Sequence, residues 1–374
     1  MGRHIFVVGG GLAGLAAAIE AARRGLRVTL AESHAYGRDK VCGEYLSAEA
    51  ASDLEALGCG GWVDALGPVP MRRLALLASL RGRDSGEARL ELSPPGPPSF
   101  SITRRALEAF LAARARASGV TVLERSPVRS LEARAGRYRY RAGDAEGEAD
   151  LVIAAFGKRS SLDARLGLPR AHKPEAYGAA KAYFQGGPGV LDTDVELYLI
   201  PGGYVGLNPV EGGRIGMCAL LDGRDATSDW GELSARFSQC APLRRRLETL
   251  GAPLGPVRGL ARFGFGPQKL VDIDAAAGTV TLFCGDAARM MPSFTGDGMA
   301  VAIRSGRLAA EAAASRDPAA GYRRAYAAEF TSRLFWAGLL HEAFLRPGVF
   351  QALAPIVGRA PRLVDRLYAF TRGR

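Results

Sequence analysis

Near the start of the chain stands the sequence Ile5-Phe6-Val7-Val8-Gly9-Gly10-Gly11-Leu12-Ala13-Gly14. Its apolar opening predicts a buried strand, and the alanine-rich run from Leu12 to Arg24 predicts a helix that ends at Gly25. Between them, G-x-G-x-x-G allows a tight turn, close approach of a pyrophosphate to backbone N–H groups, and close packing of helix on strand. Strand, glycine turn and helix in this order predict a Rossmann-like dinucleotide-binding unit, with Gly9, Gly11, Ala13 and Gly14 at the cofactor.

An acidic residue follows the next predicted strand. Val28 to Ala31 is again apolar, and Glu32 comes directly after it. A carboxylate at this strand end can accept hydrogen bonds from both hydroxyls of a ribose, and it would repel a 2′-phosphate. The first motif therefore predicts a site for FAD or NAD, with NADPH the less suitable ligand.

The later part of the chain separates these two cofactors. Asp286 ends a predicted strand over 279–284, and the glycine-rich run 295–299 opens a predicted helix over 300–314. An Asp at a strand end can bind ribityl hydroxyls, and the N–H dipoles of a helix start can face the flavin N1 and C2 carbonyl. NAD has no ribityl chain, so this second site favours FAD.

These motifs resemble those of the FAD-dependent oxidoreductases with a glutathione-reductase-like FAD domain, the group of aromatic-ring hydroxylases, geranylgeranyl reductases and flavin-dependent halogenases. The resemblance covers most of the chain. It implies an enzyme with FAD as cofactor and NAD(P)H as transient reductant. In that group, a helix opening R-x-x-L-[DE] supplies an arginine near the cofactor, and a position shortly after the third strand contacts adenine. The cofactor-binding residues implied here are Gly9, Gly11, Ala13, Gly14, Glu32, Cys42, Gly43, Arg104, Val128, Gly157, Asp286, Pro292, Gly298 and Met299.

Departures from the group's motifs bear on the reaction. Hydroxylases usually carry Asp-Gly after the middle strand, where this chain has Phe156-Gly157-Lys158-Arg159-Ser160, which puts NADPH handling by that motif in doubt. The segment 203–209 keeps the Tyr and Pro of the geranylgeranyl-reductase substrate motif but lacks its Trp. The Trp-x-Trp-x-Ile-Pro segment of halogenases is absent from the sequence, which disfavours an ordinary halogenase.

Two candidate catalytic residues follow the ribose acid. The segment Lys40-Val41-Cys42-Gly43-Glu44 is similar to the Cys-Gly segment of geranylgeranyl-reductase-like proteins, which lies against the flavin. The resemblance implies that the Cys42 thiol tunes the site, and Glu44 is a candidate for moving a proton at the substrate. The alternatives are a small buried cysteine and a structurally paired glutamate.

The predicted fold class is α/β, with an inserted antiparallel β-sheet domain and a helical C-terminus. Residues 176–222 alternate β-like runs with glycine turns, as an antiparallel meander does. We therefore expect a discontinuous FAD-binding domain over 1–70, 100–160 and 272–315, a β-rich substrate domain over 71–99 and 161–271, and a helical segment over 316–374.

Composition excludes several classes of protein. With 48% hydrophobic residues, the 374-residue chain can bury a large core, which excludes disorder. Its five cysteines form no C-x-x-C pair and its four histidines are scattered, so neither a disulfide framework nor a metal site is indicated. The net charge of +11 comes without a basic-aromatic repeat, which disfavours nucleic acid as a partner. No signal peptide or membrane span is recognisable, so the expected location is the cytoplasm.

The sequence leads to one preferred function and two alternatives. The preferred function is an FAD-dependent monooxygenase that hydroxylates a hydrophobic, aromatic or polyketide-like small molecule. The first alternative is a reductase that saturates carbon–carbon double bonds of an isoprenoid or lipid, and the second is a flavin electron carrier. Residues 331–374 carry seven arginines against two acids among apolar residues. Weak peripheral contact with an anionic membrane is one interpretation of this tail, although Pro347, Pro355 and Pro361 would break a long interfacial helix.

Overall fold

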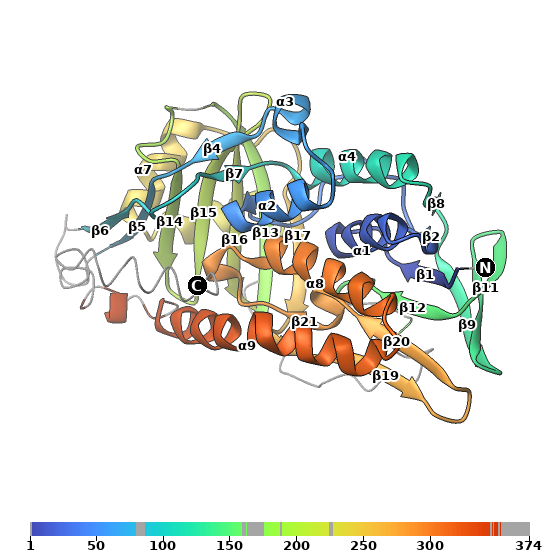
Figure 1. The fold of residues 1–374 in the computed structure, drawn as a ribbon. Coiled ribbons are helices and arrows are strands. Elements are labelled where there is room, and N and C mark those ends of the chain that lie inside the picture. The colour runs from blue at the N-terminus through green and yellow to red at the C-terminus, as the bar shows by residue number, and fades with distance from the viewer. Residues whose placement is uncertain are drawn as a thin grey trace.

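The computed structural model describes residues 2–79, 87–158, 162, 176–187, 189–223, 227–344, 346, 348–350 and 352 (Figure 1). Within these ranges the fold is α/β, with a largely parallel sheet covered by helices and a second, mixed sheet beside it. The predicted fold class is confirmed.

The first sheet has six strands, in the order β19 (Val271–Asp274), β20 (Thr279–Phe283), β12 (Leu151–Ala154), β1 (His4–Val8), β2 (Arg27–Ala31) and β8 (Thr121–Leu123). All neighbours pair in parallel except the edge strand β19, which runs antiparallel to β20. Strand β1 is buried along its whole length, because helices cover the parallel sheet. The carboxyl ends of β1 and β12 lie side by side, where such sheets bind ligands.

Close packing of helices builds the core beside this sheet. The helices are α1 (Leu12–Arg23), α4 (Arg104–Ala117), α8 (Gly298–Ala313) and α9 (Pro318–Phe344). A Cβ on Gly306 would lie 2.1 Å from the carbonyl oxygen of Ala13, so only glycine lets α8 approach α1 this closely. The Tyr322 hydroxyl of α9 donates to the carbonyl of Phe283 at 2.7 Å and ties that helix to β20.

The second sheet has seven strands, in the order β17 (Arg258–Phe263), β13 (Tyr177–Gln185), β16 (Arg214–Asp222), β15 (Gly203–Val210), β14 (Val195–Ile200), β5 (Leu74–Ser79) and β6 (Glu87–Leu92). It differs from the predicted antiparallel sheet in one pair, since β5 runs parallel to β14. The reason is that β5 arrives from an earlier segment of the chain instead of through a hairpin. Helices α6 (Trp230–Phe237) and α7 (Ala241–Leu250) pack on one face, and the other face turns toward the first sheet.

Small sheets and several short elements complete the described fold. One three-stranded sheet joins β3 (Tyr45–Leu46), β7 (Ser99–Ser101) and β4 (Val69–Met71), and another joins β11 (Ala145–Ala149), β10 (Arg137–Ala142) and β9 (Val128–Arg134). Helices α2 (Ala48–Ala56) and α3 (Trp62–Leu66) flank the first of these. The remaining short elements are β18 (Gly266–Pro267), β21 (Arg289–Met290), η2 (Gly285–Ala287) and η3 (Ser293–Thr295). In the described part of the chain, no helix is both long and apolar enough to cross a membrane.

Candidate cofactor and substrate site

A large cavity of about 1280 Å³ lies between the two sheets. Ligand pockets usually measure about 300–1,000 Å³, so this one has room for a large cofactor and a second molecule. We call its two sides the cofactor side and the strand side. The cofactor side is formed by the strand ends and turns around Gly9, Glu32, Asp286 and Gly298, and the strand side by apolar residues of the seven-stranded sheet.

The glycine turn after β1 has the geometry that a pyrophosphate needs. Gly9 has φ +102°, and a Cβ on it would lie 2.6 Å from the carbonyl oxygen of Ala155. A Cβ on Gly14 would lie 1.9 Å from the carbonyl oxygen of Gly9, so only a glycine at this position lets the helix pack closely on the turn. Gly11 and Ala13 line the cavity at the start of α1, whose N–H groups favour an anion there.

Glu32 directly follows β2, at the edge of this turn. Its carboxylate accepts hydrogen bonds from the backbone N–H of Gly10 at 2.8 Å and from that of His34 at 3.1 Å. The buried hydroxyl of Tyr36, beside Gly10, has no hydrogen-bond partner in the described structure. Burial, with Glu32 nearby, raises the pKa of Tyr36 well above its usual range, so the hydroxyl is a permanent donor. Sequence reasoning missed Tyr36, because no spacing rule places it here.

We expect Glu32→Ala to weaken binding of the dinucleotide. A hydrogen bond to a charged acceptor contributes about 1.5–3 kcal/mol, so the dissociation constant should rise roughly ten- to hundredfold. The variant also loses the contact to the N–H of Gly10, which adds to the effect. Cofactor titration followed by fluorescence measures the change. Glu132→Ala, an acid remote from the cavity lining, is the control. Equal affinity of Glu32→Ala and the control would show that Glu32 does not hold the ribose.

Two cations lie next to the pyrophosphate turn. Thr103 caps α4 by accepting a hydrogen bond from the N–H of Ala106. The guanidinium of Arg104 then pairs with Glu108 one turn on, and Lys40 Nζ reaches the same carboxylate at 2.7 Å. Burial alone would raise the pKa of Glu108, but Arg104 and Lys40 outweigh it and lower that pKa. One carboxylate shared by two cations leaves net positive charge beside Gly11, which suits a pyrophosphate.

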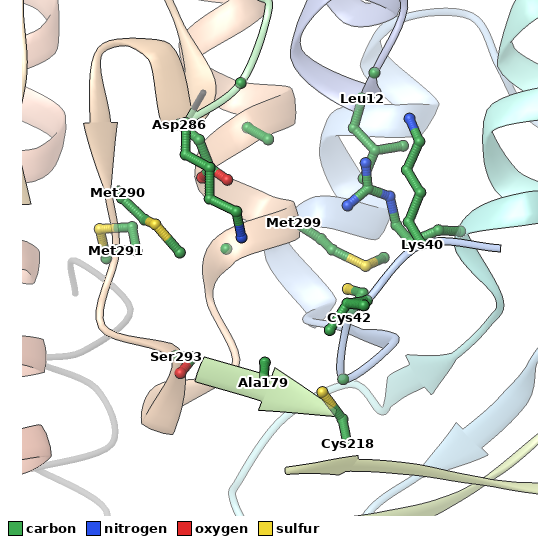
Figure 2. A pocket seen from close by; sticks show the side chains of 18 of the residues that line it. Leu12, Lys40, Cys42, Ala179, Cys218, Asp286, Met290, Met291, Ser293 and Met299 are labelled. Carbon is green, nitrogen blue, oxygen red and sulfur yellow. The ribbon is translucent and has the colours of Figure 1, made fainter. Parts of the chain in front are cut away.

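The second predicted flavin motif faces the same cavity. Asp286 lies in η2 directly after β20, and burial raises the pKa of its carboxyl against the opposing effect of Lys158 and Arg104. Gly298 and Met299 begin α8 and line the same cavity, in which Figure 2 shows Met299 together with Asp286. The positive end of the α8 dipole therefore lies at the cavity that Asp286 also lines. This arrangement combines a carboxyl that can accept hydrogen bonds from a polyol with backbone N–H donors, and its role in holding a flavin stays a prediction.

Glycines in the lining leave open space beside the backbone. A Cβ on Gly43 or on Gly298 would meet no atom of the described residues within 4 Å. Gly298 has no positive φ, so neither packing nor backbone conformation requires a glycine at that position. Open space at both residues fits a flat ligand lying against the backbone. The residues present thus fit a flavin dinucleotide.

The two candidate catalytic residues lie at the boundary between the two sides. Cys42 and Cys218 project toward the cavity from different elements (Figure 2). Glu44 is fully buried and its carboxylate accepts hydrogen bonds from Lys181 Nζ at 2.6 Å, from the Tyr183 hydroxyl at 2.7 Å and from the backbone N–H of Arg104 at 3.2 Å. Burial raises the pKa of Cys218 to about 12, so this thiol stays protonated. Proton transfer by Glu44 stays a prediction.

Most of the predicted site residues meet in this cavity. Gly14 and Pro292 do not line it: the first packs against the turn, and the second precedes η3 in the core. Arg159 and Ser160 lie outside the described residues. Lys181 was missed, although a lysine among alanines in a predicted strand is a signal for a buried ionic partner. The residues that do line the cavity are Gly9, Gly11, Ala13, Glu32, Cys42, Gly43, Glu44, Arg104, Val128, Gly157, Asp286, Gly298 and Met299.

Comparison with known proteins identifies the family of this chain. The sequence profile of the family described as FAD binding domain matches residues 3–315. A menaquinone reductase of Mycobacterium tuberculosis is 30% identical over 332 residues, which cover 84% of this chain and 77% of the relative. A digeranylgeranylglycerophospholipid reductase of Methanothermobacter thermautotrophicus is 29% identical over 323 residues, covering 83% and 77%.

Solved structures share the fold at lower identity. A geranylgeranyl bacteriochlorophyll reductase-like protein of Thermoplasma acidophilum superimposes with a TM-score of 0.76 and 20% identity, covering 99% of this chain and 95% of the other. A flavin-dependent brominase gives a TM-score of 0.81 at 18% identity, covering 100% and 94%. At such identities the likeness establishes the fold and leaves the reaction open.

Proposed function

This chain belongs to the FAD binding domain family and is an FAD-dependent oxidoreductase; from that premise we propose that it saturates carbon–carbon double bonds of an isoprenoid chain. The reductase alternative is thus preferred here to the monooxygenase that the sequence favoured. The observation that carries the proposal is the apolar strand side of the cavity, continuous with the cofactor side. The curated relatives named as reductases, which align over more than four fifths of this chain, support the same choice.

The strand side is aliphatic for most of its length. Its aliphatic residues come from edge and central strands of the seven-stranded sheet: Leu74, Leu76, Leu90, Leu92, Val195, Leu197, Leu220 and Leu260. The polar side chains that this sheet adds to the lining are those of Tyr204, Asn208 and Arg258. Such a wall suits a long flexible hydrocarbon, because each buried CH₂ contributes about 0.8 kcal/mol and needs no directional partner. An aromatic substrate with hydroxyl groups would need polar partners on this wall.

The reaction needs a hydride and a proton at the two carbons of a double bond. Bound FAD supplies two-electron redox chemistry there. The chain's own residues would bind and orient the cofactor. Arg104 and Lys40 would hold the pyrophosphate and Glu32 the ribose, while Asp286 and the N-terminus of α8 would hold the flavin end. Cys42 lines the cavity where the two sides meet, so its thiol would lie near the reacting atoms. The aliphatic wall excludes water from that region.

Hydroxylation remains the second candidate, because one relative points to it. A putative 2-heptyl-3-hydroxy-4(1H)-quinolone synthase of Rhodococcus erythropolis is 28% identical over 81% of this chain. Its named product carries a hydroxyl on an aromatic ring with an alkyl tail, and such a tail would also suit the strand side. NAD(P)H as reductant stays a prediction for either reaction. A flavin electron carrier would not need the large apolar side of the cavity, so this side disfavours that alternative.

The experiment that tests the proposal is an anaerobic single turnover. The FAD-loaded protein is reduced chemically, mixed without oxygen with a geranylgeranyl lipid that carries no quinone ring, and followed by flavin absorbance and product mass. Reoxidation of the flavin, with gain of two hydrogen atoms per double bond, is expected. Stable reduced flavin without oxygen, and a product that gains one oxygen atom once air is admitted, would contradict reduction and support hydroxylation.

The predicted membrane contact stays a prediction. On α9, Phe335 and Leu339 are 65% and 52% exposed, while Leu340 on the same helix lines the cavity. Much of the basic tail on which the prediction depends, residues 353–374 with Pro355 and Pro361, lies outside the described residues, as does Pro347. Co-sedimentation with anionic liposomes at physiological salt, comparing the full chain with its Phe335→Ala, Trp336→Ala variant, tests the contact.

A further inference from the structure

We propose that Lys181 and Tyr183 hold Glu44 as a buried clamp that fixes the Cys42–Gly43 segment at the boundary between the cofactor side and the strand side. Lys181 is then a positioning residue, because it acts on the site through Glu44. Glu44 likewise serves to hold the segment, in place of the proton transfer that its position suggested. The inference rests on the proposed function only in placing FAD in this cavity.

The clamp joins segments that are far apart in the chain. Glu44 lies just before β3, Lys181 and Tyr183 lie on β13, and the backbone N–H of Arg104 opens α4. The side chains of Lys181 and Glu44 are 1% and 0% exposed. The acceptor of their ion pair is thus cut off from water and held by donors from both parts of the cavity. A shift of the strand relative to the cofactor side would break these bonds.

The backbone of the segment depends on these contacts. Glu44 has φ +57°, in the left-handed region that residues other than glycine seldom adopt. Its N–H donates to Cys42 Sγ at 3.4 Å, and its carbonyl accepts from the N–H of Ile102 at 3.1 Å. A strained conformation persists where its surroundings hold it from several sides. The side-chain bonds of Glu44 supply that hold, and the N–H of the same residue orients the thiol.

The opposite strand leaves room for the ammonium group. A Cβ on Gly216 would lie 3.0 Å from Lys181 Nζ and 3.5 Å from Glu44 Oε2. Lys181 Nζ also lies 4.6 Å from the centre of the Tyr183 ring, whose hydroxyl bonds to the same carboxylate. The space beside Gly216, the Tyr183 ring and the Glu44 carboxylate therefore all fit a single position of the Lys181 ammonium group. Buried ion pairs add little net stability over apolar replacements, and their best-attested role is to select one arrangement.

The test measures the reactivity of Cys42 in the FAD-loaded protein. Iodoacetamide is added without substrate, and peptide mass spectrometry distinguishes Cys42 from Cys218 and from the buried cysteines. Lys181→Met leaves a buried carboxylate without its cation, so the segment should open and alkylation of Cys42 should accelerate about tenfold or more. We expect the absorption bands of bound FAD to shift in the same variant.

Arg246→Met is the matched control. Arg246 pairs with Glu196, a fully buried carboxylate that also accepts from a tyrosine hydroxyl, Tyr198, and does not line the cavity. This variant should lower the melting temperature comparably while alkylation of Cys42 stays within about twofold of the wild-type rate. The same acceleration in both variants would overturn the proposal, because general destabilisation would then explain it.

Two further variants separate positioning from charge balance. The double variant Glu44→Gln, Lys181→Met has neither of the two buried charges. Its melting temperature should therefore recover relative to Lys181→Met alone, while alkylation of Cys42 stays fast. Recovery of the slow rate would overturn the proposal. Gly216→Ala keeps both charges and crowds the ammonium, so it should accelerate alkylation about threefold, and an unchanged rate would count against the clamp. Because no step uses a substrate, failure of double-bond reduction would leave these results unaffected.

Discussion

Gly298→Val is expected to abolish retention of FAD while leaving the protein folded. A side chain there would project into the cavity beside Asp286, where an added Cβ meets no atom of the described chain within 4 Å, so it costs the fold little. It would occupy the space in which the ring must lie against the start of α8, and affinity should fall on the order of a hundredfold or more. Cofactor titration and thermal unfolding without FAD measure the two quantities separately.

Gly338→Val is the matched control for this variant. Gly338 is also a helical glycine, on α9, where an added Cβ would likewise meet no described atom within 4 Å, and it does not line the cavity. We expect it to bind FAD as the wild type does. If Gly298→Val also kept its affinity, the flavin ring would have to lie elsewhere in the cavity.

Leu76→Asp is expected to lower kcat/KM for an apolar substrate roughly a hundredfold without displacing FAD. The Leu76 side chain on β5 lines the strand side, and a carboxylate there would lose its water when a hydrocarbon binds, without gaining a partner. Leu76→Met, which conserves volume, should retain most of the activity. The absorption spectrum of bound FAD should be unchanged in both variants.

A neighbouring residue separates this effect from damage to the sheet. Leu77 follows on the same strand but packs in the core on the opposite face, under α6 and α7. Leu77→Ala should lower the melting temperature by creating a buried void, with kcat/KM nearly unchanged for the folded enzyme. If Leu76→Asp also kept its kcat/KM, the strand side would not be the substrate site.

Local patterns were sufficient to predict the cofactor side. The Gly9–Gly14 turn, Glu32 and the Asp286–Gly298 region each consist of residues close in sequence, next to strands and helices with clear apolar runs. Parallel strands bring their carboxyl ends to one edge, so these three motifs had to meet once the sheet was recognised. The hydrogen bond from Gly10 to Glu32 was not predicted, since it depends on the shape of the turn.

The boundary between the sides could not be predicted in the same way. The partner of Glu44 is 137 residues away, on a strand whose place in the sheet depends on pairings across the whole insertion. The parallel pair of β5 with β14 was missed for the same reason, because hairpin signals reveal only sequential antiparallel neighbours. The apolar character of the strands was evident from the sequence, but which face would line a cavity was not.

We propose that one cavity holds FAD on the cofactor side and an isoprenoid chain on the strand side. A crystal structure of the FAD-loaded protein with a saturated isoprenoid product bound tests it most directly. We expect the ribose at Glu32, the flavin end between Asp286 and Cys42, and the hydrocarbon along Leu76 and Leu197. A hydrocarbon bound away from these strands, with the strand side filled by water, would contradict it.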